Sequence, residues 1–279
     1  MTCTEHLPNL KALVLDMKRI DLPSYFKHVW VPGVVPDEAA IENLPTRKTY
    51  FERVPKLEEL RLATTLDADT RPFQRMAVCL NDICHPNLRI LEICNLKIYG
   101  TWAFPETIEH LRLVDCQKHI FTPDCRPPLT LPNLKSLTIA QFHWIDLEQV
   151  LRFLQSNDGV LESLRLESCD RIRATDLALL ASHAKATKNL KSLHLHGMGM
   201  YTLSDETLLF VIRNMPQLQE LHVPNTAVTG SLIKKIVLLA DGREGDFPRI
   251  KLLNLKGCGD VSFEAVEWGR ARGLKIINR

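Results

Sequence analysis

Three histidines could bring imidazole nitrogens close together. His194 and His196 are separated by one residue, and His222 follows 26 residues after His196. Imidazole nitrogen binds zinc and also exchanges protons near neutral pH. Such a metal site normally contains a carboxylate or thiolate or is oriented by one, and none is evident beside these three histidines. The residues therefore favour ordinary surface histidines, and we predict no bound metal and no cofactor.

A second group of possible metal ligands is formed by Cys79, Cys84 and His85. No other closely spaced pair completes a tetrahedral zinc site, so we predict no metal here either. The chain has 8 cysteines, and its first residues lack the basic and apolar segments of a secretory signal. Disulfide frameworks are typical of small exported domains, so the sequence indicates reduced thiols in an intracellular protein, cytoplasmic or nuclear.

The sequence motifs of common enzymes are not found. There is no phosphate-binding loop, no nucleophile elbow and no zinc-protease helix. Two Gly-x-Gly pairs, which begin at Gly197 and Gly257, lack the third glycine of a dinucleotide fingerprint. We therefore predict a protein that binds and is not an enzyme. A catalytic site assembled from distant segments stays open as an alternative.

The charge balance argues against one broad class of function. With 35 basic and 33 acidic residues the net charge is +2, so general binding to nucleic acid is not expected. Hydrophobic residues make up 45% of the chain and charged residues 24%, which is typical of a globular protein. The longest apolar runs are far shorter than the roughly 18 residues of a membrane span, so no membrane partner is predicted.

One short phrase recurs along the chain and uses many of its 44 leucines. It consists of an apolar residue, two others, an apolar residue, one other and an apolar residue. The copies begin at Leu10, Leu57, Leu88, Ile108, Leu134, Leu161, Leu190, Leu218 and Ile250. A tenth copy is expected at Leu274 with Ile277. From Ile108 to Ile250 the intervals are 26, 27, 29, 28 and 32 residues, which leaves room for one strand and one helix.

Each interval should therefore contain two kinds of element. Alternation within the phrase predicts a short strand with its second and third apolar residues on one face. Apolar residues at helical spacing predict helices over residues 147–154, 176–184, 205–212, 232–239 and 263–268. Thr175 and Ser204 are suitable N-caps for two of these helices.

A single unit of this kind cannot bury its apolar face alone. Neighbouring units must stack so that the apolar strand faces form one continuous core. We expect the stacking to bring four leucines into a single interior column, namely Leu137, Leu164, Leu193 and Leu221.

The pattern resembles leucine-rich repeats over most of the chain. The resemblance implies an α/β fold, a leucine-rich repeat solenoid or horseshoe of about nine to ten repeats. Its parallel strands would line the concave face, with helices or irregular loops on the convex face. We expect a single leucine-rich repeat domain over residues 1–279.

Nine residues into each repeat, this family has a small polar or thiol side chain that turns inward and bonds the backbone. These positions here hold Cys116, Cys169, Thr226, Cys258 and Thr65. Other repeats depart from the pattern, with Phe142, Met198, Leu96 and Lys18 at the same place. We expect the cysteines to be buried and inert.

The segment 161–181 is similar to the cysteine-containing, ribonuclease-inhibitor-like repeats of F-box proteins. Those proteins are substrate receptors of Skp1–cullin ubiquitin ligases, so the resemblance implies a non-catalytic protein–protein interaction module that recognises substrates. The F-box itself is not found, and a link to the Skp1–cullin machinery would require an F-box outside this chain. The alternative is a free-standing repeat scaffold or inhibitor with no role in ubiquitin transfer.

Two segments interrupt the repeats. An irregular insertion at about residues 21–53 contains several prolines and aromatic residues, and it is either a binding loop or a convex helix around residues 37–44 with packed connectors. We favour the helix. A second segment, residues 119–129, has no helical pattern and is expected to cross the convex side as coil.

The strand residue between the second and third apolar positions should face outward. Over nine strands these residues would form a stripe of about 40 Å, long enough for a protein or peptide. Its candidate partner-binding residues are Arg61, Glu92, Arg112, Arg165, His194, His222 and Asn254, and Val14 and Thr138 occupy the same position. We expect the second half to be positive or protonatable and to favour an acidic or phosphorylated partner, partly offset by Glu59, Glu92, Glu167 and Glu220.

Overall fold

A computed structural model gives the fold of the chain. It describes residues 9–16, 54–64, 77–79, 84–99, 104–116, 131–142, 146–154, 157–169, 171–197, 203–240 and 248–278. The chain has two compact units, Met1–Leu129 and Thr130–Arg279. The expected insertion at 21–53, with its helix at 37–44, and the expected coil at 119–129 lie outside the described residues. The single domain over 1–279 stays a prediction.

The first unit is built on parallel strands that pair in chain order. These are β1 (Ala12–Asp16), β2 (Glu59–Ala63), β4 (Ile90–Cys94) and β6 (His110–Val114). Leu60, Leu91 and Leu111 lie opposite one another and are buried. Two short strands, β3 (Ala77–Cys79) and β5 (Lys97–Tyr99), form a separate parallel pair that the sequence did not predict. Neither strand belongs to one of the copies of the apolar phrase from which the strands were predicted.

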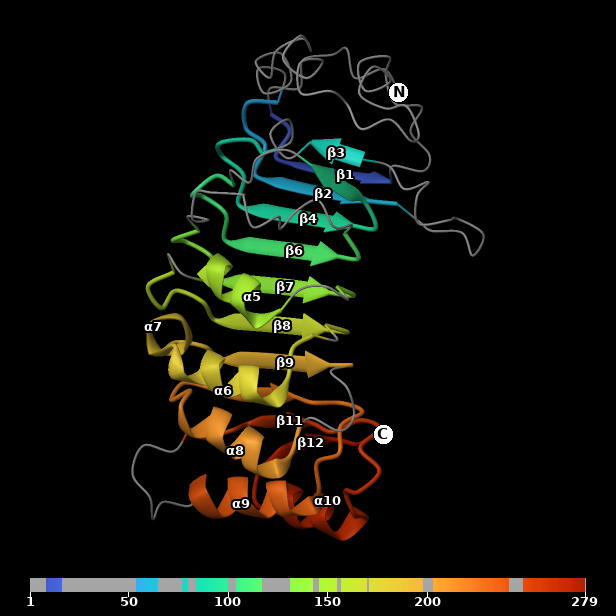
Figure 1. The fold of residues 1–279 in the computed structure, drawn as a ribbon, viewed down its shortest axis with the longest axis vertical. Helices are drawn as coiled ribbons and strands as arrows, with labels where there is room; N and C mark the ends of the chain where they lie inside the picture. Colours follow the sequence, from blue (N-terminus) through green and yellow to red (C-terminus); the bar gives the residue numbers. More distant parts are fainter. Residues whose placement is uncertain are drawn as a thin grey trace. The chain divides into compact units, whose positions relative to one another are not determined.

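The second unit continues the same pattern of parallel strands with helices between them. Its strands pair in the order β7 (Ser136–Ala140), β8 (Ser163–Glu167), β9 (Ser192–His196), β10 (Glu220–His222), β11 (Leu252–Asn254) and β12 (Lys275–Ile277). The helices of this unit lie on one side of the strands (Figure 1). The other strand face is therefore left for outward-facing side chains.

The interior leucine column is confirmed by the strand register. Leu137 lies opposite Leu164, Leu164 opposite Leu193, and Leu193 opposite Leu221. All four side chains are fully buried. The column continues to Leu253 and then to Ile276. The tenth phrase was therefore predicted one residue out of register, because Ile276 fills the interior position and Ile277 faces outward beside Asn254.

The expected helices are confirmed with small shifts at their ends. They are α5 (Leu147–Leu154), α6 (Ala174–Ser182), α8 (Asp205–Arg213), α9 (Gly230–Ala240) and α10 (Phe263–Arg270). A further helix, α7 (Ala184–Thr187), was not predicted. One turn of helix has too few residues to show a helical period.

The helix caps are partly as expected. The Ser204 hydroxyl accepts a hydrogen bond from Thr207 N at 3.2 Å, which confirms it as an N-cap. Thr175 is not an N-cap, because it lies inside α6. The helix begins at Ala174, and its N-cap is Arg173. The Asp176 carboxylate accepts a hydrogen bond from Arg173 N at 2.7 Å and so closes that end of the helix.

The inward thiols bond the backbone of the preceding repeat, as the resemblance implied. Cys116 Sγ donates to Ile93 O at 3.4 Å, Cys169 Sγ to Ile139 O at 3.6 Å, and Cys258 Sγ to Val223 O at 3.3 Å. Thr226 Oγ1 donates to Val223 O at 2.8 Å. In repeats that depart from the pattern, the apolar side chains of Phe142 and Leu96 fill the position and are buried.

Burial should make these thiols slow to react. Burial raises the pKa of Cys116 well above its usual range, and burial followed by the nearby Glu92 raises the pKa of Cys94 to about 11. Since only the thiolate is nucleophilic, we expect Cys116 in the folded protein to be alkylated at least about tenfold more slowly than in urea at pH 8. Peptide-resolved mass spectrometry after a short iodoacetamide pulse measures this ratio. Equal rates in the two states would contradict the buried thiol.

A left-handed residue stands immediately before the inward position in successive repeats. Its φ angle lies between 47° and 75° at Asn95, Asp115, Gln141, Ser168, Gly197, Asn225 and Gly257. This conformation is costly for most residues and easiest for Gly, Asn and Asp, which occupy five of the seven positions. The left-handed residue changes the direction of the backbone after each strand, so that the side chain of the following residue points into the core.

Gly257 has the least room for a side chain among these positions. An added Cβ would lie 2.0 Å from Asn225 Oδ1, and the φ of 75° at this position disfavours alanine. We expect Gly257→Ala to lower the free energy of unfolding by about 2 kcal/mol. Gly259→Ala is the matched control, because a Cβ there meets nothing within 4 Å. Urea unfolding compares the two variants, and equal stabilities would contradict the constraint.

Candidate protein-binding surface

The outward residues form columns across each set of strands, as predicted. In the first unit Val14, Arg61, Glu92 and Arg112 lie opposite one another on successive strands. In the second unit the column contains Thr138, Arg165, His194, His222 and Asn254. The candidate residues thus occupy the expected strand positions within their own units. A single stripe over nine strands stays a prediction.

Both arginines of the first column form ion pairs with glutamates. Arg61 Nε lies 2.6 Å from Glu59 Oε1, and Arg61 Nη1 lies 3.6 Å from Glu92 Oε2. Glu92 also faces Arg112, whose Nε lies 3.0 Å from Glu92 Oε1. These side chains are partly exposed, so the pairs add little stability but do reduce the positive field. The surface alternates in charge along this column.

The second column carries less positive charge than the sequence suggested. Arg165 is paired with Glu167, and its Nε donates to Glu167 Oε1 at 2.5 Å. Burial, followed by the neighbouring His222 and Arg165, lowers the pKa of His194 to about 4. Burial also lowers the pKa of His222, although Glu220 opposes that shift. Both shifts favour the neutral imidazole near pH 7, so these two histidines add little positive charge to the column.

The two neutral rings stack directly on each other. The centroids of His194 and His222 lie 3.7 Å apart, and the ring planes differ by 9°. Stacking follows from the register, since the two residues face each other on β9 and β10. Burial is the main reason that the neutral forms are favoured, and for His194 the neighbouring His222 adds to it.

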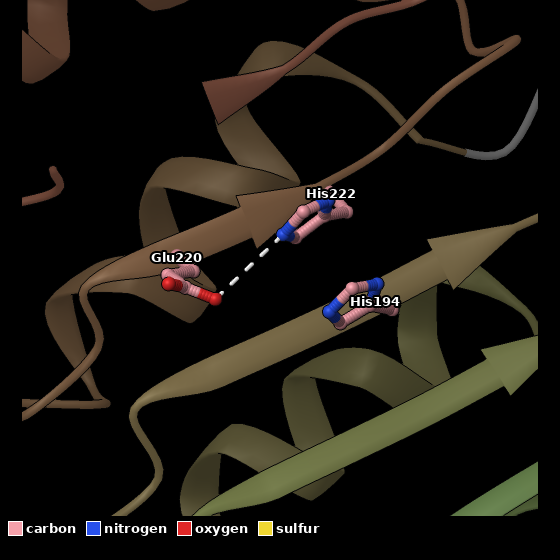
Figure 2. A group of neighbouring side chains, drawn as sticks. All are labelled: His194, Glu220 and His222. Carbon is pink, nitrogen blue, oxygen red and sulfur yellow. Dashed lines mark ion pairs between the residues drawn. The ribbon is translucent and has the colours of Figure 1, made fainter. Parts of the chain in front are cut away.

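The structure separates His196 from the other two histidines. His196 is not part of the cluster. Its Nε2 lies 3.3 Å from Nδ2 of Asn225, which is in the turn after β10. Glu220 takes the place of His196, and the possible ligand atoms of His194, Glu220 and His222 all lie within 4.8 Å of one another (Figure 2). The sequence pattern identified Glu220 only as a nearby charge. The strand register places it beside Ser192, within reach of both rings.

A short hydrogen-bond network fixes the protons in this cluster. The Ser192 hydroxyl donates to Glu220 Oε2 at 3.1 Å and lies 3.1 Å from His194 Nε2. Since a hydroxyl has a single proton, Ser192 accepts a hydrogen bond from His194, which carries its proton on Nε2. His222 Nε2 lies 3.9 Å from Glu220 Oε2 and is a buried atom without a hydrogen-bond partner among the described residues.

The other suggested ligand group is not supported. His85 is buried, and its Nδ1 accepts a hydrogen bond from Asn87 N at 3.1 Å. Neither Cys84 nor His85 belongs to a cluster of possible metal ligands in the part of the chain that the structure describes. The side chain of Cys79 lies outside the described part.

No helix within the described ranges combines the length and apolar character needed to cross a membrane. No protein-family model matches the sequence, and no curated protein matches it.

Solved structures do resemble the chain. A chain of the yeast Rad7–Elc1 complex aligns with 98% of this chain and 69% of its own length, with a TM-score of 0.55 and 16% identity. A chain of the TLR13–ssRNA13 complex aligns over 77% of this chain with a TM-score of 0.49 and 19% identity, and this chain spans only 27% of it. An internalin from Listeria monocytogenes aligns over 81% of this chain and 61% of its own, with a TM-score of 0.38 and 15% identity.

The similarity to the Rad7–Elc1 chain bears on the fold alone, because the identity is 16%. The similarity to the Rad7–Elc1 chain agrees with the strand order, the buried leucine column and the helices on one side of the strands. The chain therefore has the α/β solenoid fold of a leucine-rich repeat protein.

Proposed function

We propose that the chain is a non-catalytic protein–protein interaction module that binds a partner protein on its outward strand face. The observation that carries the proposal is the column of polar side chains from Arg165 to Asn254, held in register by four successive parallel strands. A rigid array of this kind presents side chains at fixed spacing, which favours recognition of a protein surface. An intracellular location is part of the proposal.

The charge pattern narrows the class of partner. Arg165 can bind a carboxylate or phosphate in a bidentate manner, but it already pairs with Glu167. An acidic or phosphorylated side chain of the partner would have to displace that carboxylate. A partner that also offers a basic group to the released Glu167 would replace both halves of the pair. We therefore propose a partner with acidic and basic groups interspersed.

A charge reversal at the centre of the column tests this proposal. We would capture the tagged chain from cells and quantify its partners for the wild type, Arg165→Glu and Arg152→Glu. Arg152 is the matched control, because it is exposed on α5 and forms a helical ion pair with Glu148. Recovery should fall about tenfold or more with Arg165→Glu and stay unchanged with Arg152→Glu. Equal recovery of every partner with Arg165→Glu would reject this face as the binding surface.

We further propose that the chain acts as the substrate-recognition repeats of an F-box-type ubiquitin ligase receptor, with repeats of the cysteine-containing subtype. The inward thiols of Cys116, Cys169 and Cys258 support the subtype. The similarity to a chain of a complex with Elc1 supports a role in a larger assembly. The alternative is a free-standing scaffold or inhibitor. Pull-down of the full open reading frame with purified Skp1 and with Elc1 separates them, since the scaffold should bind neither.

A further inference from the structure

We propose that His194, Glu220 and His222 form a binding site for a divalent transition metal ion of the zinc class. Their possible ligand atoms lie within 4.8 Å of one another on the outward faces of β9 and β10 (Figure 2). Two imidazole nitrogens and a carboxylate oxygen are a donor set that zinc commonly takes, with a fourth position left for water. The cluster also supplies the carboxylate whose absence argued against a metal at the three histidines.

The bridging hydroxyl of Ser192 shows that the cluster converges on one place. It bonds Glu220 and His194 at 3.1 Å each, so these two side chains already point toward a common neighbour. A metal ion bound at roughly 2.0–2.2 Å to each ligand would replace that bridge, and the His194 ring would then carry its proton on Nδ1 and not on Nε2. The third ligand atom, His222 Nε2, is 3.9 Å from Glu220 Oε2, a gap that side-chain rotation can close.

The environment of His222 Nε2 is a second observation that supports a bound metal ion. This atom is a buried nitrogen without a hydrogen-bond partner among the described residues. Leaving a buried polar atom unsatisfied costs stability, and such atoms are rare in folded proteins. Coordination of a metal ion would satisfy this nitrogen. The stacked rings must first rotate, because parallel imidazole planes do not direct their lone pairs to one point.

The neighbouring Asn254 controls how readily His222 can serve as a ligand. Lys256 N donates to Asn254 Oδ1 at 3.1 Å, so the Asn254 amide group faces His222 Nδ1 at 3.4 Å. In the metal-free protein His222 therefore carries its proton on Nε2. Metal binding removes that proton while Nδ1 takes one up, so no net proton is released. The new Nδ1–H then faces an amide donor, which weakens metal binding.

This network predicts that one substitution will strengthen the site. In Asn254→Asp the carboxylate can accept a hydrogen bond from His222 Nδ1–H, an arrangement that orients metal-binding histidines in many proteins. We expect zinc to bind about tenfold more tightly to this variant than to the wild type. A gain of affinity does not depend on removing a ligand and so cannot result from misfolding.

The experiment is a calorimetric titration of zinc into the full chain, reduced and freed of metal with a chelator. We expect His194→Ala, His222→Ala and Glu220→Gln each to weaken zinc binding at least about tenfold. His196→Ala is the matched control and should bind as the wild type does, because His196 lies outside the cluster. Circular dichroism verifies that each variant is folded.

Cobalt(II) absorption distinguishes this site from zinc held by the free cysteines. The proposed ligands contain no sulfur, so the cobalt-loaded protein should lack thiolate-to-metal charge-transfer bands. The proposal is overturned if His222→Ala binds zinc as tightly as the wild type, if Asn254→Asp brings no gain, or if His196→Ala loses the same binding. Thiolate bands accounting for all bound cobalt would also overturn it.

Discussion

Replacement of Leu164 by alanine is expected to lower the free energy of unfolding of the second unit by about 3–5 kcal/mol. Leu164 is fully buried and lies between Leu137 and Leu193 in the interior column. Alanine there leaves a cavity that the neighbouring strands cannot close without losing their own pairing. Each repeat is stabilised chiefly by its contacts with its two neighbours, so the cavity also weakens the packing of the repeats on either side.

Leu179→Ala is the matched control for this variant. Leu179 lies on α6 with 56% of its side chain exposed, so its removal should change stability by less than about 0.5 kcal/mol. Urea unfolding followed by circular dichroism gives both values. Similar small losses in the two variants would mean that the leucine column is not the core of the unit.

The second large effect is expected at Asn157, a buried amide between α5 and β8. Its Nδ2 donates to Leu134 O at 2.7 Å, and its Oδ1 accepts from Val160 N at 2.9 Å and from Leu161 N at 3.0 Å. The side chain thus connects two successive repeats through the backbone groups that precede their strands. We expect Asn157→Ala to lower the free energy of unfolding by about 3–4 kcal/mol, because it leaves these groups without partners.

Two further variants identify the cause of that loss. Asn157→Asp keeps the acceptor oxygen but places a buried carboxylate against Leu134 O, so near pH 7 it should be no more stable than Asn157→Ala, and it should gain stability over that variant at low pH, where the protonated acid can donate to Leu134 O. Asp158→Ala alters the exposed neighbouring residue and should be almost neutral. Thermal unfolding ranks the four proteins. If Asn157→Asp gains no stability over Asn157→Ala even at low pH, the hydrogen bonds made by the Asn157 side chain are not the cause of the loss.

Much of the fold could be predicted because its signals are local. The apolar phrase predicted the strands other than β3 and β5, and helical spacing predicted the helices other than α7 to within a few residues. The inward position of Cys169 was implied by the resemblance to leucine-rich repeats, and its hydrogen bond to Ile139 O agrees with it. The misplaced tenth phrase shows the limit of this reasoning, since Leu274, Ile276 and Ile277 are all apolar and only strand pairing chooses between them.

The candidate site was predictable in position but not in chemistry. Alternation along a strand placed Arg165 and His194 on the outward face correctly. It could not show that Arg165 is paired with Glu167 or that the two histidine rings stack. These features depend on the side-chain rotamers and on the solvent exposure of each group. The periodic pattern of apolar residues in the sequence gives neither.

The sequence by itself determined the repeating unit, its strand and helix, and which face of each strand is buried. Those properties depend on residues within a few positions of one another, so periodicity is enough to reveal them. Only the tertiary structure decided that Glu220 and not His196 joins His194 and His222, and that the two rings are neutral. The physical reason is that these residues meet across strands about one repeat apart, where register, burial and neighbouring charge act together.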